Sequence, residues 1–167
     1  EQKAYMIVAG FLLFGLWMYS MNTIQIRRMA LTKERLRTRV LTLMHAAALV
    51  EKVHDIEQAN ATSHPHLFAF LHAVQNLHYQ EEYVFILDTE GRTWADSSGS
   101  NAPPTVRQPR TQPTQEAIDK LLQTATQGGG FVTYEWKHPL KGDICPKLSY
   151  VGAFADHPFV IGCGTYT

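Results

Sequence analysis

Residues 131–167 have the sequence FVTYEWKHPLKGDICPKLSYVGAFADHPFVIGCGTYT. Three runs rich in β-branched and aromatic residues alternate here with clusters of turn-forming residues. Such runs between turn clusters are typical of antiparallel strands joined by hairpins. The predicted strands are Phe131–Trp136, Lys147–Phe154 and Phe159–Tyr166, and the breaks between them hold Pro139, Gly142, Asp143, Asp156, His157 and Pro158.

Two further strands are predicted before this stretch. Tyr83–Asp88 runs into Glu90 and Gly91, where glycine suits the positive φ of a strand-ending turn. Thr93–Ser97 is the expected returning strand. Five strands are enough for one sheet with a covered face, so the predicted fold class is α+β, a five-stranded antiparallel sheet flanked by helices.

The length and the net charge of the chain limit the classes of function that are expected. The chain has 167 residues, enough for one domain with a substantial core, and its 15 basic residues balance its 15 acidic ones. A nucleic-acid partner is not expected, because it would require a clustered basic face. Cys145 and Cys163 match no metal or haem spacing, and a disulfide between them and two small buried side chains remain equal alternatives.

The N-terminal stretch Ala4–Ile26 contains no charged side chain. An apolar run of about 20 residues can cross a bilayer as one helix. A secretory signal peptide is the alternative, but no convincing cleavage site follows, so a retained lipid-embedded anchor is predicted. The basic residues that follow, among them Arg27 and Arg28, would by the positive-inside rule place the next domain in the cytoplasm.

Helices are predicted on both sides of the first two strands. Residues 27–58 lack Gly and Pro and show helical apolar spacing, and a further helix is expected from Ser63 to Tyr79. A loop with four prolines then precedes a capped helix at residues 114–127. Such a loop is a plain surface connection or a lid over a binding site. No metal site or cofactor loop is expected, since the scattered histidines lack partner ligands and the triple glycine follows a helix.

The order of these elements resembles the single Cache domain family of bacterial extracytoplasmic sensors. The resemblance rests on four stretches and their joint order: YVFILDTEGR at 83–92, GFVTYEW at 130–136, PKLSYV at 146–151 and VIGCGTY at 160–166. It implies a PAS-like, non-catalytic ligand-binding module on the outer side of the inner (cytoplasmic) membrane, in the periplasm or outside. The implied parts are a membrane helix at 4–26, a long juxtamembrane helix at 27–58 and a single Cache-like domain at 59–167.

The resemblance also implies a ligand pocket. Tyr134 and Trp136 alternate along one strand and so share a face, and with Lys147 they would form an anion-accepting surface under the proline loop. Sheet core is the alternative for the aromatic rings, and a surface position is the alternative for Lys147. The implied ligand-binding residues are Tyr134, Trp136, Lys147, Tyr83, Trp94 and Asp96. Asp96-Ser97 stands where the family tends to have His-Pro, and this carboxylate would disfavour a carboxylate ligand.

Two functions follow from this pattern, and both are non-catalytic. The first is a membrane-anchored domain that binds a small molecule or a protein partner and has no output module of its own. The second is a structural accessory subunit of a larger membrane complex, respiratory or photosynthetic, in which the sheet domain is a protein interface. An enzyme is not expected: Asp88, Glu90, Asp96 and His138 have no spacing that defines a reaction.

Overall fold

The computed structural model describes residues 2–57, 73, 82–96, 112–154 and 159–167, with side chains for 10–48, 73, 82–93, 115–154 and 159–167. The predicted helix at 63–79 lies outside these ranges except for residue 73, and the proline loop is also outside them. Helix α1 is continuous from Gln2 to Glu57 and so includes both helices predicted at the N-terminus. Its first part, Glu1–Arg35, is one compact unit, and residues Leu36–Thr167 form the other. Over the described residues, no helix combines the length and the apolar character that a membrane crossing requires.

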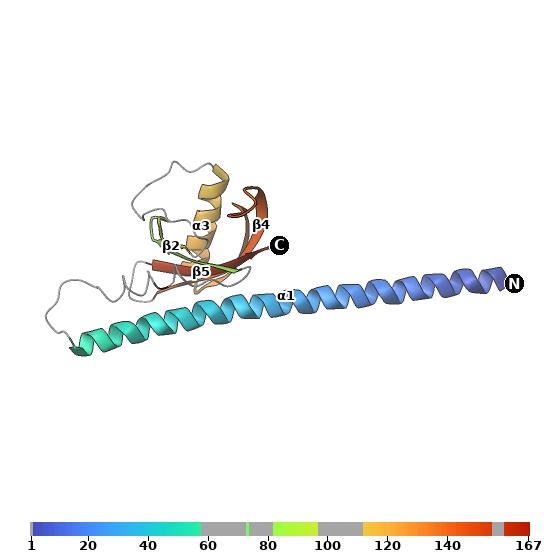
Figure 1. Ribbon diagram of the computed structural model, residues 1–167, viewed down its shortest axis with the longest axis horizontal. Helices are drawn as coiled ribbons and strands as arrows, with labels where there is room; N and C mark the ends of the chain where they lie inside the picture. Colours follow the sequence, from blue (N-terminus) through green and yellow to red (C-terminus); the bar gives the residue numbers. More distant parts are fainter. Residues whose placement is uncertain (1, 58–72, 74–81, 97–111, 155–158) are drawn as a thin grey trace. The chain divides into compact units, whose positions relative to one another are not determined.

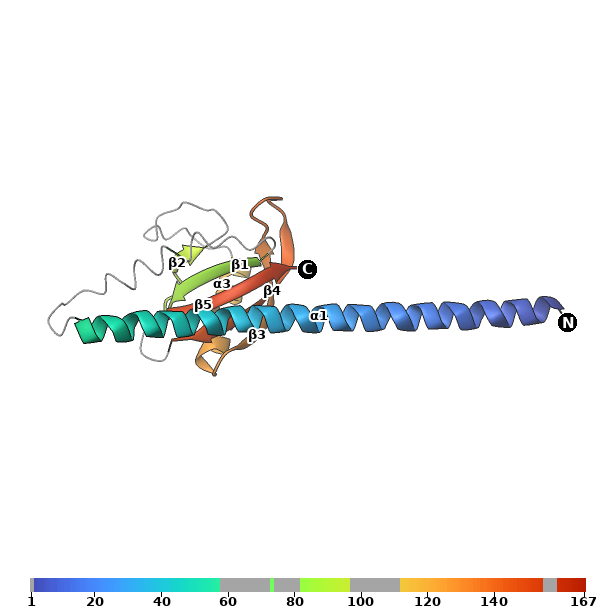
Figure 2. The same ribbon diagram turned by 60° about the horizontal axis from the view of Figure 1, so that its bottom comes forward.

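The second unit is built on an antiparallel sheet. Its elements are β1 (Glu82–Asp88), β2 (Thr93–Asp96), α3 (Gln112–Thr126), β3 (Gly130–Lys137), β4 (Ile144–Ala153) and β5 (Phe159–Tyr166). The strand order is β2-β1-β5-β4-β3, so the last strand of the chain lies at the centre of the sheet (Figure 2). The predicted α+β class with an antiparallel sheet is confirmed. The predicted strand at Lys147 begins earlier, at Ile144, because pairing with β3 extends to the hairpin.

Among the described elements, α1 packs on one face of the sheet and α3 on the other (Figure 1). On one face, Leu36 and Val40 of α1 pack against Val84, Ile86 and Ile161, all of which are fully buried. On the other face, α3 buries Ala117, Leu121 and Ala125 against residues of β1, β3, β4 and β5. The apolar spacing of both helices matches these contacts, since residues three and four apart lie on one helix face.

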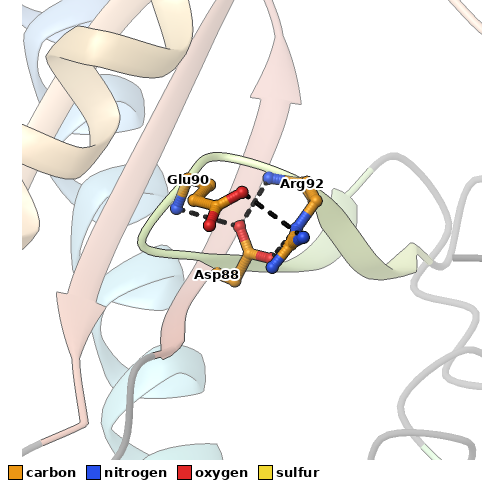
Figure 3. Close-up of polar contacts among 3 residues, drawn as sticks. All are labelled: Asp88, Glu90 and Arg92. Atoms are coloured by element: carbon orange, nitrogen blue, oxygen red, sulfur yellow. Dashed lines mark hydrogen bonds and ion pairs between the residues drawn. The ribbon is translucent and has the colours of Figure 1, made fainter. Parts of the chain in front are cut away.

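The β1–β2 hairpin is closed by Asp88, which is 4% exposed (Figure 3). Its Oδ1 accepts hydrogen bonds from the backbone N–H groups of Glu90 at 3.0 Å and Arg92 at 2.8 Å, and its Oδ2 pairs with the Arg92 guanidinium. The hydrogen bond to Asp88 raises the pKa of Arg92. Gly91 has φ 75°, a conformation that glycine adopts without strain. The predicted turn at this site is confirmed.

An ion pair joins α1 to the start of β1. Arg39 contacts Glu82, whose side chain is only 6% exposed, and Glu82 is opposite Thr165 of β5. Because Glu82 precedes Tyr83 in an extended strand, the two side chains project to opposite faces of the sheet. The ion pair therefore lies directly behind the strand end that carries Tyr83.

The disulfide alternative for Cys145 and Cys163 is wrong, and both thiols are free. The register pairs Cys163 with Tyr150, so Cys145 lies five positions further along β4 and on the opposite face. Five strand residues span about 17 Å, far beyond the reach of a disulfide. Burial raises the pKa of the Cys163 thiol to about 11, despite the opposing effect of Arg39 and Lys147.

Candidate functional site

The residues predicted for a ligand pocket converge on the sheet face that α3 partly covers. The register pairs Tyr134 of β3 with Lys147 of β4, and Lys147 with Tyr166 of β5. Residues opposite each other in adjacent strands project to the same face. Trp136, two positions along β3, shares that face and meets Tyr134 edge to face, with ring centroids 5.7 Å apart. The sheet thus brings Tyr134, Trp136 and Lys147 together.

Lys147 is the charged centre of this face. It is only 5% exposed, so it is not the surface strand lysine of the alternative interpretation. Its Nζ lies 5.5 Å from the ring centroid of Tyr83, 5.3 Å from that of Phe85 and 5.1 Å from that of Tyr166. We call these three aromatic side chains the ring cluster. A cation within about 6 Å of a ring centroid is attracted by the ring quadrupole, which offsets part of the cost of burying the ammonium group.

A buried pair of hydroxyl groups lies on the same sheet face as Lys147. Tyr134 Oη and Ser149 Oγ are 2.9 Å apart, and either can be the donor. Ser149 is fully buried and Tyr134 is 8% exposed. Tyr134 also belongs to the apolar cluster packed on α3, so its ring is part of the hydrophobic core while its hydroxyl group forms a hydrogen bond. The pair thus adds two hydroxyl groups to the sheet face that carries Lys147.

The other predicted site residues come from the first two strands. Tyr83 is half-buried and belongs to the ring cluster. Asp96 is opposite Phe85, and Trp94 lies at a β-bulge between Thr93 and Ala95, so β2 borders the same region of the sheet. The side chains of Trp94 and Asp96 and the proline loop predicted as a roof lie outside the described residues.

Phe85, Tyr166 and the Ser149 hydroxyl group also belong to this candidate site, although the sequence pattern did not predict them. Phe85 has the same strand parity as Tyr83, so alternation alone predicts that both rings share a face. Tyr166 requires the β4–β5 register, because it is opposite Lys147. Its hydroxyl group donates to the Lys137 carbonyl at 2.8 Å, and its ring lies 4.4 Å from that of His138. These contacts hold the Tyr166 ring beside the ammonium group.

Asp88 and His138, two of the polar residues considered for catalysis, lie at opposite ends of β5. Asp88 is opposite Phe159 at one end of β5, whereas His138 contacts Tyr166 at the other end. Seven strand residues separate these ends, or about 23 Å. Among the described residues, no group of three or more His, Cys, Asp or Glu side chains could hold a metal ion. Among the described residues, the functional groups on this sheet face are the buried ammonium group of Lys147, aromatic rings and hydroxyl groups.

The sequence and the fold of this chain are similar to those of known proteins. The family model described as single Cache domain 2 matches residues 27–167. A Cache chemosensory domain, solved for the structural basis of carboxylic acid recognition, has a TM-score of 0.69 and 19% identity, covering 81% of this chain and 93% of that one. A methyl-accepting chemotaxis protein from Vibrio parahaemolyticus has a TM-score of 0.64 and 17% identity, covering 83% and 90%. These two similarities show a shared fold.

Two other relatives have higher sequence identity. The periplasmic sensor domain of a chemotaxis protein is 26% identical with a TM-score of 0.59, over 80% of this chain and 96% of that one. The sensor histidine kinase MctS of Rhizobium johnstonii is 39% identical over 51 residues, which are 30% of this chain and 11% of the kinase. The matched segment is thus a small part of that relative.

Proposed function

The chain belongs to the single Cache domain family, and from this premise we propose that it is the extracytoplasmic ligand-binding domain of a membrane-anchored sensor, with Lys147 as the residue that receives an anionic group of a small ligand. The observation that carries the proposal is the 5% exposure of Lys147 inside the ring cluster. An ammonium group that is buried away from water interacts with an anion more strongly than the ammonium group of a surface lysine does.

The chemistry of the face favours a small carboxylate. A carboxylate accepts several hydrogen bonds, and the ammonium group of Lys147 is a charged donor on the same sheet face as the Tyr134–Ser149 hydroxyl pair. The aromatic rings would cover the apolar part of such a ligand. The similar domain solved with carboxylic acid recognition as its subject supports this class of ligand. Asp96 lies opposite Phe85 on β2, and its negative charge would disfavour a simple acid. The ammonium group of an amino acid would balance this charge, so the ligands tested should include both simple acids and amino acids.

The membrane anchor is supported by the sequence. Ala4–Ile26 carries no charged side chain, and the large apolar side chains from Phe11 to Ile26 are exposed on α1. An uncharged, mostly apolar run of about 20 residues can cross a bilayer as one helix. The basic residues that follow do not exclude an extracytoplasmic domain, since long domains are translocated largely regardless of their charge. We therefore place the sheet domain outside the cytoplasm, anchored in the inner membrane.

Isothermal titration of the whole chain in mild detergent tests the proposal. The panel comprises acetate, propionate, pyruvate, succinate, glycine and alanine. The substitution Lys147→Met should weaken binding of the preferred ligand about tenfold or more, the equivalent of a lost charge-assisted hydrogen bond. Lys141→Met is the matched control, because Lys141 is an exposed lysine of the β3–β4 turn and should leave affinity unchanged.

The outcome that contradicts a sensor is silence of the wild-type chain across the whole panel. Equal losses in both lysine variants would contradict the assignment of the site to Lys147. Co-purification of the chain at fixed stoichiometry with a larger membrane complex, together with a silent panel, would instead support the structural accessory subunit.

A further inference from the structure

Two glycines of the central strand β5 lie beneath the site. Gly162 and Gly164 are both buried, and Gly164 is opposite Tyr83 on one side and Ser149 on the other. Gly162 is similarly opposite Phe85 and Val151. The residues of these opposite pairs all project toward the sheet face that carries Lys147. At two positions in the middle of this face, therefore, the strand presents backbone without a side chain.

Lys147 uses the space above Gly164. Its partner in β5 is Tyr166, yet its ammonium group lies near Tyr83 and Phe85 of β1, on the far side of β5. To reach them, the Lys147 side chain crosses β5 diagonally. A Cβ added at Gly164 would lie only 2.9 Å from Lys147 Cε and would overlap Ser149 Oγ. Real Cβ atoms do not approach side chains so closely, so any larger residue would force both groups to move.

Gly162 leaves space for an aromatic ring of the site in the same way that Gly164 leaves space for Lys147. An added Cβ there would overlap the ring of Phe85, so this ring lies directly over the glycine backbone. The Lys147 ammonium group is 5.3 Å from the same ring. The Gly-Cys-Gly segment of β5 thus holds one ring of the cluster and the lysine stem side by side.

We propose that Gly164 is a positioning residue of the ligand site: the absence of a side chain there allows Lys147 to cross β5 and holds its ammonium group inside the ring cluster. Gly162 has the same role for the Phe85 ring. This inference rests on the proposed function for its link to ligand affinity, but the placement of Lys147 is a property of the chain without ligand. It adds to the site two residues that have no polar side chain.

The ligand-free test is the proton chemical shift of the Lys147 ε-methylene group in the whole chain, assigned by comparison with Lys147→Arg. The surrounding rings should shift this signal away from the value of an exposed lysine in the wild type. In Gly164→Ala the signal should return toward that value. Gly152→Ala is the matched control, because its Cβ would meet the flexible Met44 side chain on the opposite face, at 2.8 Å from the sulfur. It should leave the Lys147 signal in place.

A second pair of variants separates positioning from folding. Ser149→Ala removes the Oγ that the Cβ introduced by Gly164→Ala would overlap, so the double variant Ser149→Ala/Gly164→Ala should regain part of the stability that Gly164→Ala loses. It should still show a displaced lysine signal and, relative to Ser149→Ala alone, about tenfold weaker binding of acetate.

An unchanged ε-methylene signal in Gly164→Ala would overturn the inference, as would full acetate affinity in the double variant. If the wild type binds none of the compounds of the panel while the signal moves as expected, the positioning role stands and the carboxylate ligand fails. If the wild type binds acetate and the signal stays in place, the proposed function stands and Gly164 has no positioning role.

Discussion

Replacement of Asp88 should show how much the β1–β2 hairpin contributes to stability. Asp88 is 4% exposed and accepts two backbone hydrogen bonds, at 3.0 Å from Glu90 and 2.8 Å from Arg92, besides its contact with the Arg92 side chain. Hydrogen bonds to a charged acceptor contribute about 1.5–3 kcal/mol each, but the freed N–H groups lie in an exposed turn and can be partly rehydrated. We therefore expect Asp88→Ala to lower the free energy of unfolding by about 3 kcal/mol.

Asp88→Asn should cost much less, because the amide oxygen can accept the same two backbone hydrogen bonds with about half the strength. We expect a loss of about 1 kcal/mol for this variant. The assay is urea unfolding of the whole chain in mild detergent, followed by tryptophan fluorescence and linear extrapolation. Glu90→Gln is the control, since Glu90 is exposed and its replacement should change stability by less than about 0.5 kcal/mol. Equal losses for Asp88→Asn and Asp88→Ala would refute the reasoning, because they would show that the charge rather than the turn hydrogen bonds determines stability.

Two further predictions concern buried ionisable groups. Burial raises the pKa of Cys163 from 9.0 to about 11, so its neutral thiol contributes stability that is complete below pH 9 and is lost as the pH rises through 11. The wild type should therefore lose about 2–3 kcal/mol more than Cys163→Ala between pH 8 and pH 11 in urea unfolding, and parallel pH profiles of the two proteins would contradict this. Arg39→Met removes a positively charged partner of the buried Glu82 carboxylate and should cost about 3 kcal/mol, whereas Arg39→Met/Glu82→Leu should recover most of that loss. Failure of the double variant to recover stability would show that the ion pair itself, rather than an unpaired charge, stabilises the domain.

Much of the fold could be predicted from local pattern. The runs of β-branched and aromatic residues between turn residues identified β1, β3, β4 and β5, and the Asp88–Gly91 turn followed from the preference of glycine for positive φ. Three successive strands at the end of the chain do lie side by side. Their place relative to β1 was not predicted, because the pairing of β1 with β5 joins segments far apart in sequence and has no local signature.

The site was predicted only in part for a similar reason. Alternation placed Tyr134 and Trp136 on one face, but it cannot show whether Lys147 is exposed or buried. Its burial depends on the register of β5, which sets Gly164 beside the lysine stem. The two cysteines illustrate the same limit, since only the observed register shows that Cys145 and Cys163 project to opposite faces. Register between distant strands is what the sequence pattern leaves undetermined.

The position of β5 in the sheet also determines the order in which the domain can fold. The β1–β2 and β3–β4 hairpins each form from neighbouring segments, but β5 alone hydrogen-bonds to both of them. Until residues 159–166 are synthesised, no strand pairing can therefore join the two hairpins. Closure of loops this long makes the last step slow, and the unpaired strand edges stay open to aggregation or proteolysis during it. The eight residues of β5 thus join the two hairpins that precede them in the chain into one sheet.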